Sequence, residues 1–240
     1  MSATPAVTRP RPRPTADAPR VDRKGQILLA AERLFAQYGF HAVSIRQIAQ
    51  EAQVPLALVA YYFGQKQDLF HAIFAHWSGT IDERMQGLQA VQAQAHSRMK
   101  LQRIVEAFVE PVIRLRASPE GEAYALLMTK GLTPQGDEAD RVVRDFFDPM
   151  AEAFITAIHE TLRHENPQAS VTRGTAAWCY QFSLGTLVHH LADARVARLS
   201  HGQCVPYDSQ VQPHLIQFIV HGIRGAVHSF HPPVKKRRLS

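Results

Sequence analysis

Two short helical patterns joined by a tight turn, between Ser44 and Phe63, constrain the fold of this chain more than any other feature. Ser44 is a favourable helix N-cap, and Gln47, three residues later, completes a capping box. Apolar residues then recur at helical spacing until the chain turns at Gln53, and Pro55 suits the first position of a second helix. Helices joined by so short a turn cross steeply, so the segment predicts a helix-turn-helix, whose second helix can enter a DNA major groove.

A further helix is predicted just upstream of this motif. Its apolar face runs from Ile27 to Tyr38, and Gly39 follows as a C-cap. This helix supplies the packing partner that a small helix-turn-helix unit needs. A fourth helix is predicted to begin near Lys66.

Residues 23–74 resemble the DNA-binding part of the TetR/AcrR family of one-component transcriptional repressors. The shared residues are spread over many positions in register: Ile27-Leu28, Ala30-Ala31, Leu34-Phe35, Gly39-Phe40, Ser44, Ile48-Ala49, Ala52, Val54, Tyr61-Tyr62-Phe63, Lys66 and Leu69-Phe70. The resemblance implies an all-α protein with a three-helix N-terminal helix-turn-helix domain and a larger helical ligand-binding and dimerisation domain of about nine helices. It also implies a repressor that a small effector releases from a palindromic double-stranded DNA operator.

Length and charge support this division. A chain of 240 residues exceeds the usual single domain, so we expect the helix-turn-helix domain over residues 21–66 and the second domain over 67–230. The net charge is +6, and the basic tails, residues 1–20 and 231–240, together carry +7, which leaves the rest of the chain at about −1. The Pro- and Ala-rich residues 1–20 are expected to be disordered, either as a solvated leader or as an arm that reaches DNA.

The resemblance also implies which residues contact DNA. Ser44, Tyr62 and Lys66 would bind phosphates, whereas Arg46 and the exposed face of residues 55–61 would read bases. A solvated helix charge is the alternative for Arg46. The second helix is unusually apolar, so we expect its exposed side chains to read thymine methyl groups. The full predicted set is Ser44, Arg46, Pro55, Leu56, Ala57, Ala60, Tyr61, Tyr62 and Lys66.

Apolar spacing predicts helices throughout the remainder of the chain. The fourth helix is expected to reach Ile81, and the next, beginning near Ser97, to kink around Ala107 because Pro111 removes a backbone hydrogen bond. Pro149 either interrupts one long helix or begins a new one. Further helices are expected at 120–131, 137–165, 170–199 and 208–230.

Large side chains on the apolar stripes of these helices are candidates to line an effector pocket, although ordinary core packing is the alternative for each. Such a set favours an apolar or aromatic effector. The candidates are Trp77, Phe108, Met128, Phe147, Phe154, Trp178 and Phe182.

The last predicted helix has a second, flatter face with small residues, which permit close approach of another helix. The family pairs its last two helices in a four-helix dimer interface, and a homodimer is also what a palindromic operator requires. The predicted interface residues are Phe218, Gly222, Gly225 and Ser229, with packing inside one chain as the alternative.

Other classes of function lack support in the sequence. There is no Gly-rich phosphate loop, no G-x-S-x-G elbow and no Cys/His ligand set, so neither an enzyme, a cofactor nor a metal site is predicted. A second interpretation keeps the helix-turn-helix but assigns the C-terminal domain to a protein partner or to an architectural role, without an effector.

Cellular location and cysteine chemistry are also constrained. No uncharged apolar run of membrane-spanning length and no apolar signal segment is present, so we expect a cytoplasmic protein without a membrane partner. Cys179 is expected to be a buried hydrophobe and Cys204 an incidental loop thiol, with a redox sensor as the alternative.

Overall fold

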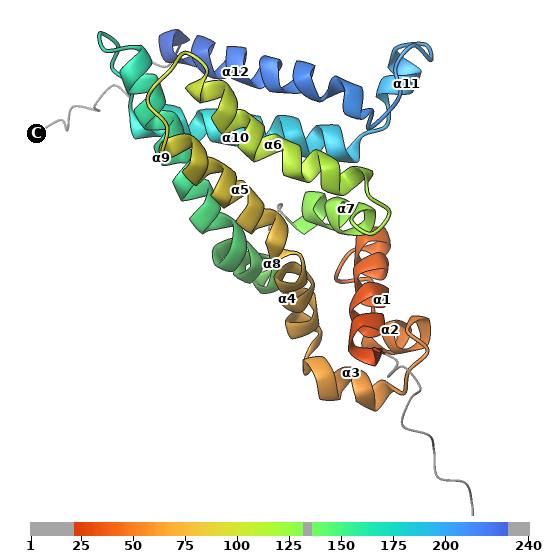
Figure 1. Ribbon diagram of the computed structural model, residues 1–240. Coiled ribbons are helices and arrows are strands. Elements are labelled where there is room, and N and C mark those ends of the chain that lie inside the picture. The colour runs from red at the N-terminus through yellow and green to blue at the C-terminus, as the bar shows by residue number, and fades with distance from the viewer. Residues whose placement is uncertain (1–21, 132–135, 230–240) are drawn as a thin grey trace, which may run out of the picture.

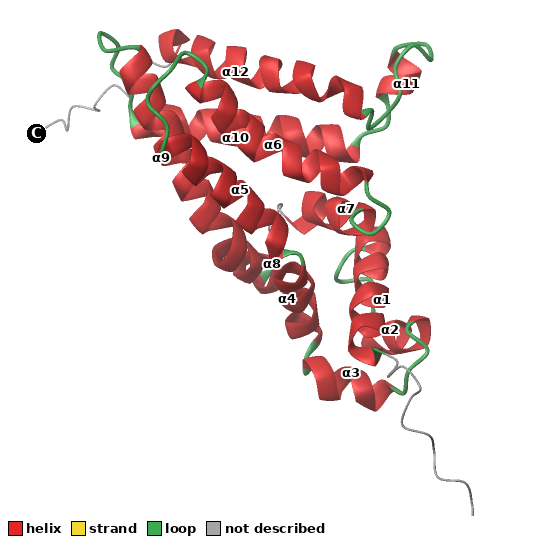
Figure 2. Cartoon of the chain, viewed as in Figure 1, coloured by secondary structure: helices red, strands yellow, loops and turns green. Residues whose placement is uncertain are grey.

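The computed structural model describes residues 22–131 and 136–229. These residues form helices joined by turns and loops, with no strand among them (Figure 2). The all-α prediction is therefore confirmed. Predictions that concern residues 1–21, the turn at 132–135 and residues 230–240 lie outside the described residues.

The helix-turn-helix forms as predicted. Helices α1 (Arg23–Tyr38), α2 (Ile45–Glu51) and α3 (Leu56–Phe63) pack on one another. Ser44 caps α2 in a complete capping box with Gln47, and Gly39 ends α1 with a φ of 83° that favours glycine. The turn between α2 and α3 contains Gln53 at a φ of 53°. Pro55 is the N-cap of α3, one position earlier than expected.

The predicted helix from Lys66 to Ile81 is two helices, α4 (Lys66–His76) and α5 (Ser78–Gln92). They meet at Trp77, whose indole Nε1 donates to Glu32 Oε2 on α1 at 2.7 Å. Periodicity did not reveal the break because the apolar residues of both helices face one continuous core.

The later helices follow the predicted order, but their ends differ, and the single helix expected over 170–199 ends at Ala192 and is followed by a separate short helix. The elements are α6 (Lys100–Ala117), α7 (Glu122–Gly131), α8 (Asp137–Val142), the π-helical turn η1 (Val143–Phe147), α9 (Asp148–Glu165), α10 (Arg173–Ala192), α11 (Val196–Leu199), the short 3-10 turn η2 (Ser209–Val211) and α12 (Gln212–Ser229). Pro111 lies inside α6 without ending it. Pro149 lies in the first turn of α9, which follows η1 without a loop, so the chain is helical from 137 to 165 with a π-helical turn inside it, and Asp148 is not the N-cap of a separate helix.

The helices are arranged so that the helix-turn-helix occupies one end of the molecule (Figure 1). Helices α10 and α12 lie at the opposite end, together with α6, and α4 runs from α3 into the larger body. Contacts of α1 with α7 and of α4 with α8 attach the two parts to each other. A single hydrophobic core extends from α1 to α12.

Candidate DNA-binding surface and effector cavity

Helix α3 presents an exposed, mostly apolar surface to solvent. Leu56 is 47% exposed and Tyr61 is 79% exposed, while Val59 on the opposite face is fully buried. The Tyr61 and Tyr62 rings meet edge to face with their centroids 5.1 Å apart. Pro55, Ala57 and Ala60 of the predicted set are also exposed, as are Ser44 and Arg46 at the start of α2. Except for Lys66, the predicted DNA-binding residues therefore share accessible surface.

The ammonium group of Lys66 already has two contacts within the chain. Its Nζ donates to the carbonyl oxygen of Val43 at 2.7 Å and lies 4.2 Å from the centre of the Phe40 ring. Burial lowers the pKa of this ammonium, and the nearby Glu138 carboxylate opposes that shift. Lys66 thus ties the start of α4 to the loop before α2, and its phosphate contact stays a prediction.

A cavity of about 600 Å³ lies in the larger body. It is bounded by residues of α5, α6, α7, η1, α9 and α10, and leucines and valines dominate the part formed by α10. A cavity of this size falls in the range of small-molecule sites. The residues lining it are Arg84, Val112, Met128, Thr129, Val143, Phe147, Asp148, Met150, Ala151, Glu152, Ile155, Ala177, Tyr180, Gln181, Leu184, Leu187, Val188 and Leu191.

Only part of the predicted pocket set lines this cavity. Met128 and Phe147 do. Phe108 and Phe154 are buried just behind it, with ring centroids 5.2 Å apart and Phe108 against Tyr180. Trp77 lies at the junction of α4 and α5, stacked on Tyr124 at 5.4 Å.

Trp178 and Phe182 require a correction. They are 53% and 55% exposed on α10, with ring centroids 5.5 Å apart, and neither lines the cavity. An apolar stripe identifies a face that is covered, but it does not say whether the same chain or a second chain covers it. Phe218, 68% exposed on α12, contributes to the same apolar region, since Phe182 and Phe218 border one groove with Gly222.

The predicted interface on α12 is open toward solvent. A Cβ added to Gly222 would meet nothing within 4 Å, so this glycine is not needed for packing inside the chain. Gly225 is also exposed. Ser229 ends α12, and its side chain lies outside the described residues. Trp178, Phe182, Phe218, Gly222 and Gly225 define an exposed apolar face of α10 and α12.

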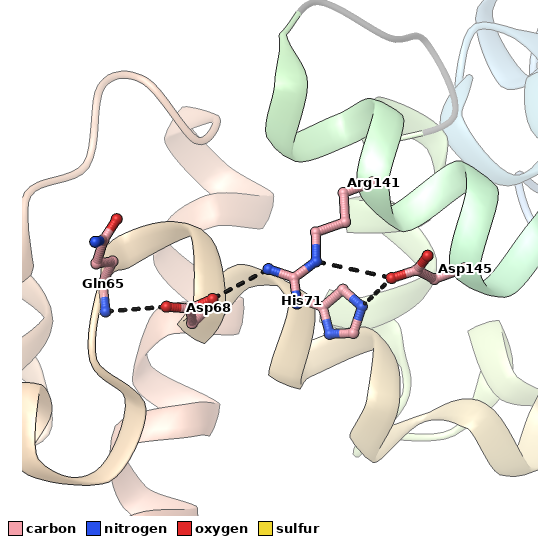
Figure 3. Close-up of polar contacts among 5 residues, drawn as sticks. All are labelled: Gln65, Asp68, His71, Arg141 and Asp145. Carbon is pink, nitrogen blue, oxygen red and sulfur yellow. Dashed lines mark hydrogen bonds and ion pairs between the residues drawn. The ribbon is translucent and has the colours of Figure 1, made fainter.

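A group of charged side chains joins α4 to the wall of the cavity (Figure 3). Arg141 on α8 donates to Asp68 Oδ1 on α4 at 3.1 Å and lies 3.7 Å from Asp145. Asp145, in η1, has its Oδ2 2.8 Å from His71 Nε2 on α4. We call Asp68, His71, Arg141 and Asp145 the polar link.

The polar link has one end at the DNA-binding unit and the other at the cavity. Asp68 also accepts from the backbone N–H of Gln65, which begins α4 directly after α3 (Figure 3). Asp145 lies between Val143 and Phe147, both of which line the cavity. Phe74 of α4 packs on Phe147, with 6.0 Å between ring centroids. A change in the cavity wall therefore has a short, contiguous route to the start of α4.

Sequence reasoning missed the polar link because its members are ordinary surface charges in the sequence. It also missed Arg84, for which a signal existed: Ile81, Arg84, Leu88 and Val91 follow helical spacing, which places the arginine on the inward face.

The two cysteines lie in different environments. Cys179 is buried, which raises the pKa of its thiol to about 11, and Cys204 is exposed. Within the described ranges, no cluster of His, Cys, Asp and Glu has the grouping needed to hold a metal ion. Across the same ranges, no helix is both long and apolar enough to cross a membrane.

Two family profiles match the chain, one in each part. Residues 27–73 match the profile described as bacterial regulatory proteins of the tetR family, and residues 106–222 match that described as a tetracyclin repressor-like C-terminal domain. Together they cover about two thirds of the chain.

Individual proteins are similar over different extents. The HTH-type transcriptional activator FasR of Mycolicibacterium smegmatis is 32% identical over 93 residues, which is 38% of this chain and 41% of FasR, so the match spans less than half of that relative. The solved structure of FadR from Bacillus subtilis in complex with stearoyl-CoA has a TM-score of 0.54 at 16% identity and covers 83% of this chain and 98% of that one. PfmR from Thermus thermophilus has a TM-score of 0.55 at 17% identity, covering 82% and 95%. At such identities the two structures establish the fold alone.

A capped helix-turn-helix with an exposed second helix, joined to a helical body of this fold, defines a DNA-binding transcriptional regulator. The chain belongs to the TetR family, since both profiles match in the order that its two parts occupy.

Proposed function

We propose that this protein is a homodimeric repressor that leaves a palindromic operator when a small effector occupies the cavity. The observation that carries the proposal is the position of the cavity: its η1 wall contacts α4, and only two residues separate α4 from the recognition helix α3. A ligand that favours one position of α4 over another would change the separation of the two recognition helices in the dimer.

Operator recognition is proposed to rest on a few exposed residues. Arg46 would fork onto a guanine, and Leu56 and Ala57 would contact thymine methyl groups, which their exposure supports. Ser44 and Tyr62 would contact phosphates. If the methyl contacts are correct, replacing operator thymines by uracil, which lacks the methyl group, weakens binding at those positions and nowhere else.

The dimer is proposed to form through the exposed apolar face of α10 and α12. Three large exposed side chains, Trp178, Phe182 and Phe218, support this, because a contiguous apolar surface of this kind usually marks an interface. A symmetric pairing would place two copies of the helix-turn-helix on one side of the assembly, as a palindromic operator requires.

The proposed function is tested by measuring operator affinity with and without candidate ligands at fixed salt. A repressor of this kind loses affinity when its effector binds, and a promoter bearing the operator is derepressed by the same compound. An affinity that no ligand alters, together with binding to long duplexes regardless of sequence and a steep salt slope, would instead support an architectural role.

A further inference from the structure

Arg84, on α5, is a charged residue buried in the wall of the cavity. It is 3% exposed, and its Nε and Nη2 atoms are buried without a hydrogen-bond partner in the described part of the chain. Native proteins rarely bury a charged donor without a partner, because the lost hydration is not replaced. The missing partner therefore needs a physical explanation.

The aromatic contact of Arg84 does not use its N–H donors. The guanidinium carbon lies 4.2 Å from the centre of the Phe108 ring, so the ring occupies a face of the guanidinium. Nε and Nη2 share one edge of the group, and that edge has the geometry to donate two parallel hydrogen bonds to a single carboxylate. Burial lowers the pKa of Arg84 to about 10, which still leaves it positively charged at neutral pH.

The remaining lining residues fit the apolar part of a ligand. Arg84 is the one positively charged residue among those lining the cavity, and the surface beyond it is formed largely by aliphatic side chains of α10. The two acidic lining residues, Asp148 and Glu152, are both exposed, which places them toward solvent. Glu152 is also neutralised by an ion pair with Arg173. The polar lining residues Thr129 and Gln181 carry no charge.

We propose that the cavity binds an apolar molecule with one carboxylate, which pairs with Arg84 while the hydrocarbon part lies along Leu184, Leu187 and Leu191. The inference rests on the proposed function only where it calls this ligand the effector, because binding to the cavity does not require operator release. It sharpens the sequence-based expectation of an apolar or aromatic ligand, because a neutral molecule leaves the two donors of Arg84 unpaired.

Binding to the full-length protein, without DNA, tests the inference. Isothermal titration calorimetry compares n-alkanoates from hexanoate to laurate, and 3-phenylpropionate, with the alcohols of the same carbon skeleton. The best carboxylate is expected to bind about 10- to 100-fold more tightly than its alcohol, the range for hydrogen bonds to a charged group. If no carboxylate exceeds its alcohol, the inference is overturned.

Variants identify the residue responsible. Arg84→Met keeps a similar apolar stem and is expected to remove the preference for the carboxylate, while alcohol affinity changes by less than about threefold. Arg114→Met is the matched control, since Arg114 is an exposed arginine of α6 paired with Glu83, and it should preserve the preference. If Arg84→Met weakens acid and alcohol equally, Arg84 has only a structural role and the inference fails.

A second variant protects the test against misfolding. Arg84→Lys keeps the charge but cannot donate in parallel from one planar edge, so carboxylate affinity should fall about tenfold with the alcohol unaffected. Unchanged carboxylate affinity in Arg84→Lys would count against the paired geometry. Operator release is measured separately. Arg84-dependent carboxylate binding that leaves operator affinity unchanged supports the inference but contradicts the repressor mechanism. Release of the operator by an alcohol but by no carboxylate supports the repressor mechanism but contradicts the inference.

Discussion

Glu32 joins α1 to the junction of α4 and α5 through a partly buried hydrogen bond. It is 1% exposed on α1, and it accepts a hydrogen bond from the Trp77 indole at the junction of α4 and α5. Burial raises the pKa of this carboxyl above its usual value of 4.5, although the bond from Trp77 opposes the shift. The ionised form is therefore disfavoured by folding.

This shift leads to a prediction about stability and pH. Because the folded pKa is raised, the folded state holds the Glu32 proton longer than the unfolded state, so stability is lost as pH rises from 4.5 through the folded pKa. Glu32→Gln keeps an acceptor for Trp77 but cannot ionise, so its stability relative to the parent should increase between pH 4.5 and pH 8. Denaturant unfolding at both pH values measures this difference.

Glu32→Ala is the companion variant. It leaves the Trp77 N–H without its partner and should cost about 1–3 kcal/mol of unfolding free energy. A Gln variant whose difference from the parent is independent of pH would contradict the raised pKa.

At the scale of elements, α4 couples the two parts because its two ends have different partners. Its first turn is held by Lys66, which bonds to the loop before α2, and by Asp68, which belongs to the polar link. Its last turn packs with Phe74 against η1. Exposed ion pairs contribute little to stability, so we assign the polar link to coupling.

Asp145→Asn tests this assignment. The substitution keeps the size of the side chain but removes the charge that faces His71 and Arg141, so the unfolding free energy should change by less than about 1 kcal/mol. The ratio of operator affinities without and with effector should fall at least about threefold, because the cavity wall and α4 then move more independently.

The measurement is a pair of operator titrations, one with saturating effector. Glu83→Gln is the matched control: it removes a charge from an ion pair between α5 and α6, away from α4. An unchanged ratio in Asp145→Asn, or an equal loss in Glu83→Gln, would rule out the polar link as the coupling element.

Features fixed by local backbone chemistry could be predicted from the sequence, whereas features fixed by tertiary contacts could not. The helix-turn-helix was predictable because Ser44, Gln47 and Gly39 act through local backbone chemistry that spacing reveals. The break at Trp77 was not, because a tertiary hydrogen bond to Glu32 fixes it. The cavity was predicted only in part: apolar stripes include Met128 and Phe147 but do not separate a cavity wall from an outer face such as that of Trp178.

At the scale of the whole molecule, the proposed dimer depends on the exposed apolar face of α10 and α12. Phe218→Glu places a charge at its most exposed large side chain and should convert a dimer into monomers, with little effect on the fold because the residue is 68% exposed. Sedimentation equilibrium measures the assembly, and operator affinity should fall at least about 100-fold because each half-site is then bound alone.

Tyr38→Glu is the control for adding a charge at an exposed large side chain. Tyr38 is 57% exposed at the end of α1, in the helix-turn-helix part of the molecule, and this variant should remain dimeric. A Phe218→Glu protein that is still a dimer would place the interface elsewhere.

The helices to which the two basic tails are joined in the sequence give a last prediction. Residues 1–20 precede α1, a helix of the helix-turn-helix part, whereas residues 231–240 follow α12, a helix at the opposite end of the molecule (Figure 1). Each tail carries four lysines or arginines, so replacing the four with glutamine changes the net charge of the chain equally in either case. The two variants therefore differ only in which end of the chain loses its charge.

Contact with phosphates should therefore depend on which tail is changed. Substituting Arg9, Arg11, Arg13 and Arg20 should lower the slope of log affinity against log salt by about 0.9 for each arginine that binds a phosphate. The matched substitution of Lys235, Lys236, Arg237 and Arg238 should leave the slope unchanged, because α12 ends far from the DNA-binding surface. Equal effects of the two variants would mean that the tails act through net charge, and no effect of either would assign residues 1–20 to a solvated leader.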